Sequence, residues 1–158
     1  MVHSVAEAKE HIKLISTNRR ARFDYHVEDK LECGIVLTGT EVKSLRAGSA
    51  QLSDAYALGK GGELFLMNAQ ISPYAPAGIL ANHEPKRTRK LLLKKREIEK
   101  LTEKQQKGGY ALIPLSIYFK EGRCKVELGV CKGKNTVDKR DTIAERESQR
   151  ELDRAKRR

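Results

Sequence analysis

Apolar residues that alternate with polar ones constrain the fold of this 158-residue chain more than any other feature. In residues 23–37, apolar or aromatic side chains stand at odd positions, among them Tyr25, Val27, Leu31, Cys33, Ile35 and Leu37. A period of two places such side chains on one face of a β-strand. We therefore expect a half-buried strand in this segment, with a bend near residues 28–30.

Glycine-containing turns join further strand segments in pairs. The apolar segments 55–58 and 63–71 flank Gly-Lys-Gly-Gly at 59–62, and the segments 110–119 and 123–131 flank Glu-Gly at 121–122. Glycine adopts positive φ without a steric penalty, so both arrangements predict β-hairpins. The first glycine cluster lacks a following GK[ST] and a following helix, which excludes a phosphate-binding loop.

Two helices are expected at the connections between strands. Thr40–Arg46 precedes Ala-Gly, and Lys94–Lys107 precedes Gly-Gly and would turn Ile98 and Leu101 inward. Residues 87–93 are ambiguous between strand and helix, and residues 73–85, with three prolines and a glycine, predict a long loop.

Short strands with helices only at connections favour a mainly β fold, and an OB-fold-like antiparallel β-barrel suits a chain of this length. We expect an N-terminal extension at 1–16, a barrel domain at 17–131 and a basic C-terminal tail at 132–158. The tail contains only five apolar residues, so it cannot pack a conventional core face.

The positive charge is concentrated in two segments. The chain has 32 Lys and Arg against 21 Asp and Glu, a net charge of +11. Residues 86–107 carry ten basic and three acidic residues, residues 132–158 carry ten and six, and the remainder is balanced at twelve each. Two basic elements on a neutral body predict a polyanion-binding protein, with nucleic acid as the leading partner. The alternative is a pair of solvated, charged helix faces.

The tail has its own helical signal. Thr142 and Glu145 have the spacing of a capping box, and arginines recur every four residues from Arg146 through Arg150 and Arg154 to residue 158. Such like charges repel on one helix face, so we expect a tail that is disordered alone and becomes helical along phosphates. A flexible solubilising tail is the alternative.

Catalytic motifs are missing from the sequence. The four histidines are scattered, no nucleophile, metal or nucleotide-binding motif is present, and Asp24 and Glu28 would be two polar positions on one strand face. We expect neither an enzyme nor a cofactor; metal-dependent nuclease activity at Asp24 and Glu28 is the alternative. Residues 86–107 contain no aromatic residue, which favours recognition of phosphates and shape in folded RNA over base stacking.

The expected compartment is the cytoplasm. No stretch approaches the roughly 20 apolar residues that a membrane span needs, and residues 1–14 are too charged for a secretion signal. Three cysteines without CxxC spacing predict neither disulfides nor a cysteine-rich zinc site. We expect a monomer without a membrane partner.

Five segments in consistent order resemble the bacterial SsrA-binding protein family, SmpB. They are NRRAR at 18–22, GIVLTGTEVKSLRAG at 34–48, ISPY at 71–74, RTRKLLL at 87–93, and KGK at 132–134 followed by DKR at 138–140. The resemblance implies an OB-like barrel that binds the tRNA-like domain of transfer-messenger RNA and brings it to stalled ribosomes for trans-translation. It also implies that the tail enters the vacant decoding centre and mRNA channel of the small subunit.

The resemblance assigns site residues to each part. On the barrel, the RNA-binding residues would be Asn18, Arg19, Arg22, Glu32, Lys43, Arg46, Arg87, Arg89, Lys90, Leu91, Lys94 and Lys95. On the tail, the ribosome-binding residues would be Lys132, Gly133, Lys134, Asp138, Lys139 and Arg140, joined by the arginine series Arg146, Arg150 and Arg154. Glu32 could equally be a surface carboxylate, and Lys43 and Arg46 solvated helix residues.

Three positions depart from the family pattern. Phe23 stands where histidine is frequent, Asn135 where a lysine commonly follows Gly-Lys, and Val137 where histidine or tyrosine is frequent. We therefore expect electrostatic contacts by the tail, without aromatic or histidine stacking. A constitutive ribosomal or chaperone-like protein that uses its basic segments for assembly is the second functional alternative.

Overall fold

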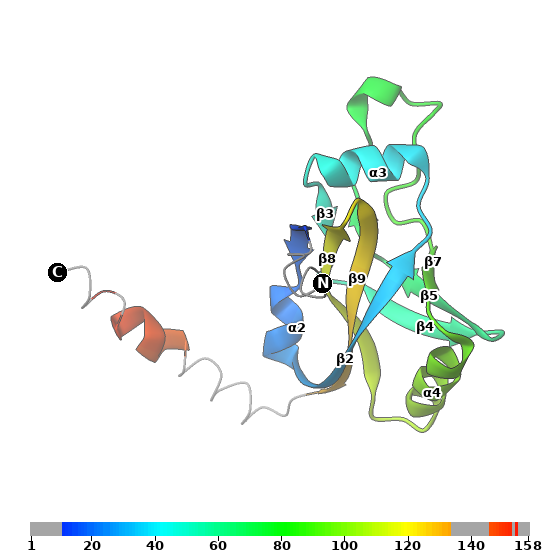
Figure 1. The fold of residues 1–158 in the computed structure, drawn as a ribbon. Helices are drawn as coiled ribbons and strands as arrows, with labels where there is room; N and C mark the ends of the chain where they lie inside the picture. Colours follow the sequence, from blue (N-terminus) through cyan, green and yellow to red (C-terminus); the bar gives the residue numbers. More distant parts are fainter. Residues whose placement is uncertain (1–10, 134–145, 153, 155–158) are drawn as a thin grey trace, which may run out of the picture.

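The computed structural model describes residues 11–133, 146–152 and 154 (Figure 1). Its elements are β1 (Ile12–Thr17), α2 (Arg19–Asp24), β2 (Tyr25–Ile35), α3 (Gly39–Arg46), β3 (Ala50–Gln51), β4 (Tyr56–Lys60), β5 (Glu63–Met67), β6 (Gln70–Ile71), the 3-10 helix η1 (Ala75–Ala77), β7 (Arg89–Leu92), α4 (Lys95–Gln106), β8 (Ala111–Lys120) and β9 (Arg123–Gly133). Residues 146–152 and 154 are helical and form the C-terminal helix.

Six strands close into an antiparallel barrel. The large sheet has the order β1-β8-β4-β5-β7-β2-β9, and β9 also pairs with β8, which completes the circle. The remaining strand, β1, pairs with residues 116–120 of β8 outside the ring. The expected mainly β, barrel-like fold is confirmed, and both predicted hairpins are present as β4–β5 and β8–β9.

Irregularities in pairing shape the barrel wall. The register between β2 and β9 shifts between Val27 and Asp29, close to the bend expected at 28–30. A second shift between β8 and β9 lies between Pro114 and Ser116. Proline has no backbone N–H to donate to the neighbouring strand, so within a barrel strand it is tolerated at a bulge, where the regular pairing is interrupted. Bulges bend a strand and increase its twist, which helps six strands close.

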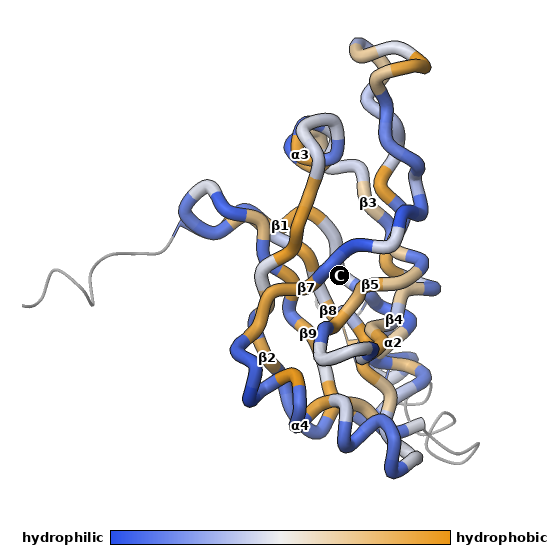
Figure 2. Tube along the Cα trace, turned by 90° about the vertical axis from the view of Figure 1, so that its right-hand side faces the viewer, coloured by the Kyte–Doolittle hydropathy of each residue, from blue (hydrophilic) through white to orange (hydrophobic). Residues whose placement is uncertain are grey.

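The core fills the barrel and is capped by α4. Inward-facing side chains from the wall are fully buried, among them Leu64, Leu91 and Leu128, while Ile98 and Leu101 of α4 pack onto this cluster. Gly59 permits the close approach of the helix: a Cβ at this position would lie 2.3 Å from Thr102 Oγ1. Figure 2 shows hydrophobic and hydrophilic residues interspersed along the strands, and many hydrophilic residues along α4.

Three segments differ from the sequence-based expectations. Residues 12–16, expected in an extension, lie in β1. Because their side chains are mostly exposed, the sequence here lacks a clear alternation of apolar and polar residues. Residues 19–24 form the helix α2, and the strand begins at Tyr25 instead of residue 23, because one and a half turns are too short to show helical periodicity. Residues 63–71 form two strands, of which β6 pairs with β3 in a separate sheet.

Candidate nucleic-acid interface

Strand β7 and the start of α4 present a row of lysines. Lys90, Lys94 and Lys95 are exposed, whereas Leu91 between them is fully buried. Strand alternation turns Lys90 outward, and its Nζ lies 3.1 Å from a carboxylate oxygen of Glu63 on the neighbouring strand. Because that ion pair is nearly half exposed, it holds Lys90 weakly and leaves it available to a phosphate.

Arg89 and Leu91 do not lie on this surface. Both have no exposed side-chain area, so the prediction that they contact RNA is corrected: they belong to the interior of the barrel. Leu91 is part of the apolar core. The same alternation that exposes Lys90 buries its two neighbours.

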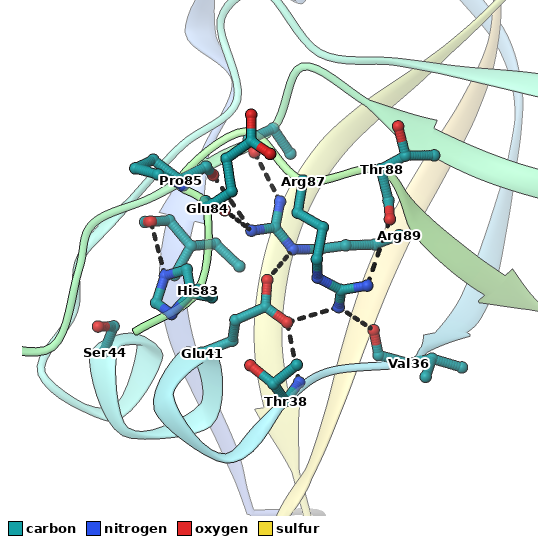
Figure 3. Close-up of polar contacts among 12 residues, drawn as sticks. Val36, Thr38, Glu41, Ser44, His83, Glu84, Pro85, Arg87, Thr88 and Arg89 are labelled. Carbon is teal, nitrogen blue, oxygen red and sulfur yellow. Dashed lines mark hydrogen bonds and ion pairs between the residues drawn. The ribbon is translucent and has the colours of Figure 1, made fainter. Parts of the chain in front are cut away.

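Arg89 is the centre of a buried polar network (Figure 3). Its Nε donates a short hydrogen bond to Glu41 Oε2, and its terminal nitrogens donate to the carbonyl oxygens of Ala69 at 2.7 Å and Pro85 at 3.1 Å. Arg87 donates to the other carboxylate oxygen of Glu41 at 2.6 Å. The network therefore ties β7 to helix α3 and to the loop that precedes β7.

Glu41 keeps its charge inside this network. Burial raises the pKa of its carboxyl group, but hydrogen bonds from Arg87, the backbone N–H of Thr38 and Arg89 outweigh that effect and lower it below the usual range. The carboxylate is thus ionised at neutral pH and matched by two guanidinium groups. Arg87 is one-third exposed and also donates to the carbonyl of Val36, so its guanidinium group makes several of its hydrogen bonds inside the protein.

Asn18 is a structural residue at the start of α2. It is 4% exposed, its Oδ1 accepts from the N–H of Ala21 as an N-cap, and its Nδ2 donates to the carbonyls of Leu52 and Pro114 at 3.0 Å each. The prediction that it contacts RNA directly is corrected, because three internal hydrogen bonds occupy its amide. Asn18 instead positions α2, which presents Arg19 and Arg22 on its exposed face.

The first residues of the C-terminal helix reach α2 through their side chains. The guanidinium carbon of Arg146 is 5.5 Å from the centroid of the Phe23 ring, and a cleft of about 400 Å³ is lined by Thr17, Asn18, Arg19, Arg22, Arg146 and Arg150. Four arginines around one cleft make it electropositive. Phe23, which departs from the family pattern, thus stacks on a cation from the tail.

Glu32 makes internal contacts on the barrel wall. Its carboxylate accepts from the hydroxyl of Tyr118 at 2.5 Å and lies 3.4 Å from Lys120 Nζ. The hydrogen bond from Tyr118 lowers the pKa of Glu32, with a further contribution from Lys120. The side chain is still 38% exposed. Its carboxylate can therefore accept a hydrogen bond from a partner while it remains bound to Tyr118 and Lys120.

Helix α3 exposes two of the predicted cations. Lys43 Nζ lies 5.7 Å from the centre of the Tyr74 ring, and the Arg46 guanidinium lies 6.0 Å from that of Phe119. The aromatic faces restrict both side chains without neutralising their charge. They remain able to bind phosphate.

The beginning of the tail continues β9. Lys132 lies 4.8 Å above the Tyr110 ring and 3.9 Å from Glu28, and Gly133 is exposed at the end of the strand. Arg154 is exposed on the C-terminal helix. The other tail positions singled out from the sequence lie outside the described residues: Lys134, Asn135, Val137, Asp138, Lys139, Arg140, the expected capping-box pair Thr142 and Glu145, and residue 158.

The predicted residues fall on separate faces. Figure 1 shows α2 and the C-terminal helix on one side of the barrel and β7 with α4 on the other, with α3 above both. The structure therefore brings Arg19 and Arg22 together with the tail, and Lys90 together with Lys94 and Lys95.

Two residues of the site, Glu41 and Tyr118, were not predicted from the sequence. The spacing of Thr38 and Glu41, which is that of a capping box, was the one available signal for Glu41.

The proposed nuclease pair is not assembled. Asp24 ends α2 and pairs with Arg20, whereas Glu28 lies in β2 and faces Lys132, so the two do not share a strand face. In the described part of the chain, no group of three or more His, Cys, Asp or Glu side chains is placed to hold a metal ion. None of the helices that the structure describes has the length and apolar character to cross a membrane.

The chain forms a small closed antiparallel barrel with separate cationic faces, an architecture that many nucleic-acid-binding proteins share. The family model described as SmpB protein matches residues 15–158. The SsrA-binding protein of Myxococcus xanthus is 56% identical over 147 residues, which are 93% of this chain and 90% of that protein. That of Acidothermus cellulolyticus is 57% identical over 143 residues, 90% and 89% of the two chains. The chain belongs to the SmpB family.

A solved structure agrees with this assignment. A chain from "tmRNA-SmpB: a journey to the center of the bacterial ribosome" is 46% identical and superposes with a TM-score of 0.66. The match covers 81% of this chain and 93% of the other.

Proposed function

We propose that this chain is an RNA-binding adaptor that binds the tRNA-like domain of transfer-messenger RNA and delivers it to stalled ribosomes for trans-translation. The observation that carries the proposal is the family match over residues 15–158. The relatives are named for binding SsrA, and the description of the solved structure places tmRNA and SmpB at the bacterial ribosome. The chain acts as a cytoplasmic monomer without a cofactor and without a reaction of its own.

The barrel supplies the contact to the tRNA-like domain. Lys90, Lys94 and Lys95 are exposed and carry positive charge, as backbone-phosphate recognition requires. Lys43 and Arg46 extend the cationic surface across α3, and Arg87 and Glu32 contribute from its border. Arg19 and Arg22 serve the same RNA from the face that also carries the C-terminal helix. Arg89, Leu91 and Asn18 act indirectly, because they hold these elements in place.

The tail supplies the contact to the ribosome. We assign its basic residues to the empty decoding centre and mRNA channel, where phosphates would neutralise the arginines at 146, 150 and 154. The helical conformation of residues 146–152 supports a tail that presents these arginines on one face. Arg146 leaves Phe23 when the tail moves into the channel.

Charge reversal tests the barrel contact. Replacing Lys90, Lys94 and Lys95 by Glu should weaken binding of the tRNA-like RNA and reduce the salt slope by about 0.7–0.9 per lost phosphate contact. The matched control reverses Lys30, Lys60 and Lys107, three exposed lysines outside this row, for the same change in net charge. Equal losses in both triple variants would mean that net charge alone attracts the RNA.

Truncation tests the division of labour. A chain ending at Gly133 keeps the pairing of β9 with β2 as far as Tyr25, so the barrel retains its wall. We expect it to bind the tRNA-like RNA nearly as well as the full chain but to lose peptide tagging on stalled ribosomes. Loss of both activities to the same extent would contradict two separable contacts.

A further inference from the structure

The loop between β6 and β7 forms an apolar finger. We use this name for residues 73–85, which Figure 1 shows extending past α3 and away from the barrel. From Ala75 to Ala81 the sequence contains no polar or charged side chain. At its tip, Ile79 and Leu80 are 95% and 102% exposed, more than any other large apolar residue described. Figure 2 shows this tip as an isolated hydrophobic end on a hydrophilic stem.

The finger is braced in its extended shape. Asn82 closes its stem, because its Oδ1 accepts from the N–H of Tyr74 at 2.8 Å and its Nδ2 donates to the carbonyls of Tyr74 and Gly78 at 2.9 and 2.5 Å. At the base, Arg89 holds the carbonyl of Pro85, and the N–H of Ile71 also donates to it. His83 bridges Thr40 and the carbonyl of Ile71. A braced loop loses little conformational entropy when it binds.

Cations surround the base of the finger. Lys43 lies beside Tyr74, and a cavity of about 370 Å³ next to the stem is lined by Lys43, Arg87, Asn82 and His83 among others. Lys86 is exposed just beyond the finger. Glu84 is the one acidic residue within the finger itself. The combination of an apolar tip with a cationic base matches a partner that offers apolar faces beside negative charge.

Unpaired nucleotides have this chemistry. Their base faces are apolar and accessible, and their phosphates lie within one nucleotide's reach of those faces. Aliphatic side chains are used as wedges against bases in nucleic-acid complexes. A protein partner would have to combine an apolar pocket with an acidic rim. The finger also leads directly into β7 and Lys90, so it is continuous with the surface that we assign to RNA.

We propose that Ile79 and Leu80 pack against unstacked bases of the bound RNA while Lys43 and Lys86 contact the adjacent phosphates. The inference rests on the proposed function and adds a base-contacting element to it. The contact is apolar, so it contributes affinity without releasing counterions. This property separates the finger from the lysine row in an experiment.

The test compares Ile79→Ser/Leu80→Ser with the unchanged chain over a series of salt concentrations. We expect the double variant to lose about tenfold or more in affinity for the tRNA-like RNA, with the salt slope unchanged. Leu14→Ser is the matched control, since Leu14 is a 57% exposed aliphatic residue on β1 outside the finger. Because the tip makes no core contact, thermal unfolding should stay the same. An unchanged RNA affinity would overturn the inference.

A crosslink identifies the partner directly. A photoreactive amino acid in place of Leu80 should crosslink to RNA at an unpaired nucleotide in the complex. Crosslinks to ribosomal protein alone, or to paired RNA alone, would refute a base contact by the tip. If the unchanged chain does not bind the tRNA-like RNA, the proposed function is wrong. If the unchanged chain binds and the double variant binds equally well, the inference about the finger is wrong and the proposed function stands.

Discussion

Replacing Arg89 by methionine tests whether the buried ion pair holds α3 and the base of the finger on the barrel. Arg89 and Glu41 both have no exposed side-chain area. Methionine fills a similar volume but cannot donate to Glu41 or to the carbonyls of Ala69 and Pro85. The substitution therefore leaves a carboxylate and two carbonyl oxygens with fewer partners.

The expected loss follows from these contacts. Removing one partner of a buried ion pair costs about 3–5 kcal/mol. Arg87 still donates to Glu41, which favours the lower end of that range. The carbonyl of Pro85 keeps the N–H of Ile71, whereas that of Ala69 adds a penalty on the order of 1–3 kcal/mol if it stays unpaired. These contributions overlap, so we expect about 3–4 kcal/mol, a large part of the roughly 5–15 kcal/mol that a domain has.

Urea unfolding, followed by circular dichroism, measures the effect. The control is Arg20→Met, since Arg20 is 63% exposed and its pairs with Asp24 and Asp54 lie at the surface. We expect less than about 1 kcal/mol for that variant. Similar losses in the two variants, or a loss below 1 kcal/mol for Arg89→Met, would refute the reasoning.

The pH dependence gives a second readout of the same pair. The pKa of Glu41 is lower in the folded protein than its usual value of 4.5, so its contribution to stability is present above that value and is lost as the pH falls through the folded pKa. In Arg89→Met the carboxyl keeps its burial but loses one guanidinium, so its pKa should rise. The acid-induced loss of stability attributable to Glu41 should therefore shrink; an identical pH profile would contradict the assigned pairing.

Two further predictions follow from other buried groups. Asn18→Ala should lower the free energy of unfolding by about 2–4 kcal/mol, because the N-cap of α2 and two hydrogen bonds to carbonyls are lost. Asn18→Asp should restore only the cap. Urea unfolding measures both variants, and an unchanged stability of Asn18→Ala would contradict the positioning role. Burial raises the pKa of the Cys33 thiol to about 12 and that of the Cys131 thiol to about 11. Neither should therefore react with a thiol reagent at pH 8 until urea unfolds the protein. Fast reaction of the native protein would contradict their burial.

Local rules account for much of the fold. The β4–β5 and β8–β9 hairpins were predictable because glycines at their turns adopt positive φ, as Gly61, Gly62 and Gly122 do. The helix α4 was predictable because Ile98 and Leu101 repeat at helical spacing and two glycines end it. The short helix α2 was not, because its stability comes from Asn18 contacts with Leu52 and Pro114, which are 34 and 96 positions away.

The candidate site divides in the same way. The amount of positive charge, the two segments that carry it and the family of the chain can all be read from the amino-acid sequence. Which of those charges face outward depends on how the strands and helices pack. Lys90 and Arg89 are adjacent cations in one strand, yet one is exposed and the other is buried. Burying a charge is possible only where partners converge on it, and Glu41, 48 positions away, reaches Arg89 only once the barrel has closed.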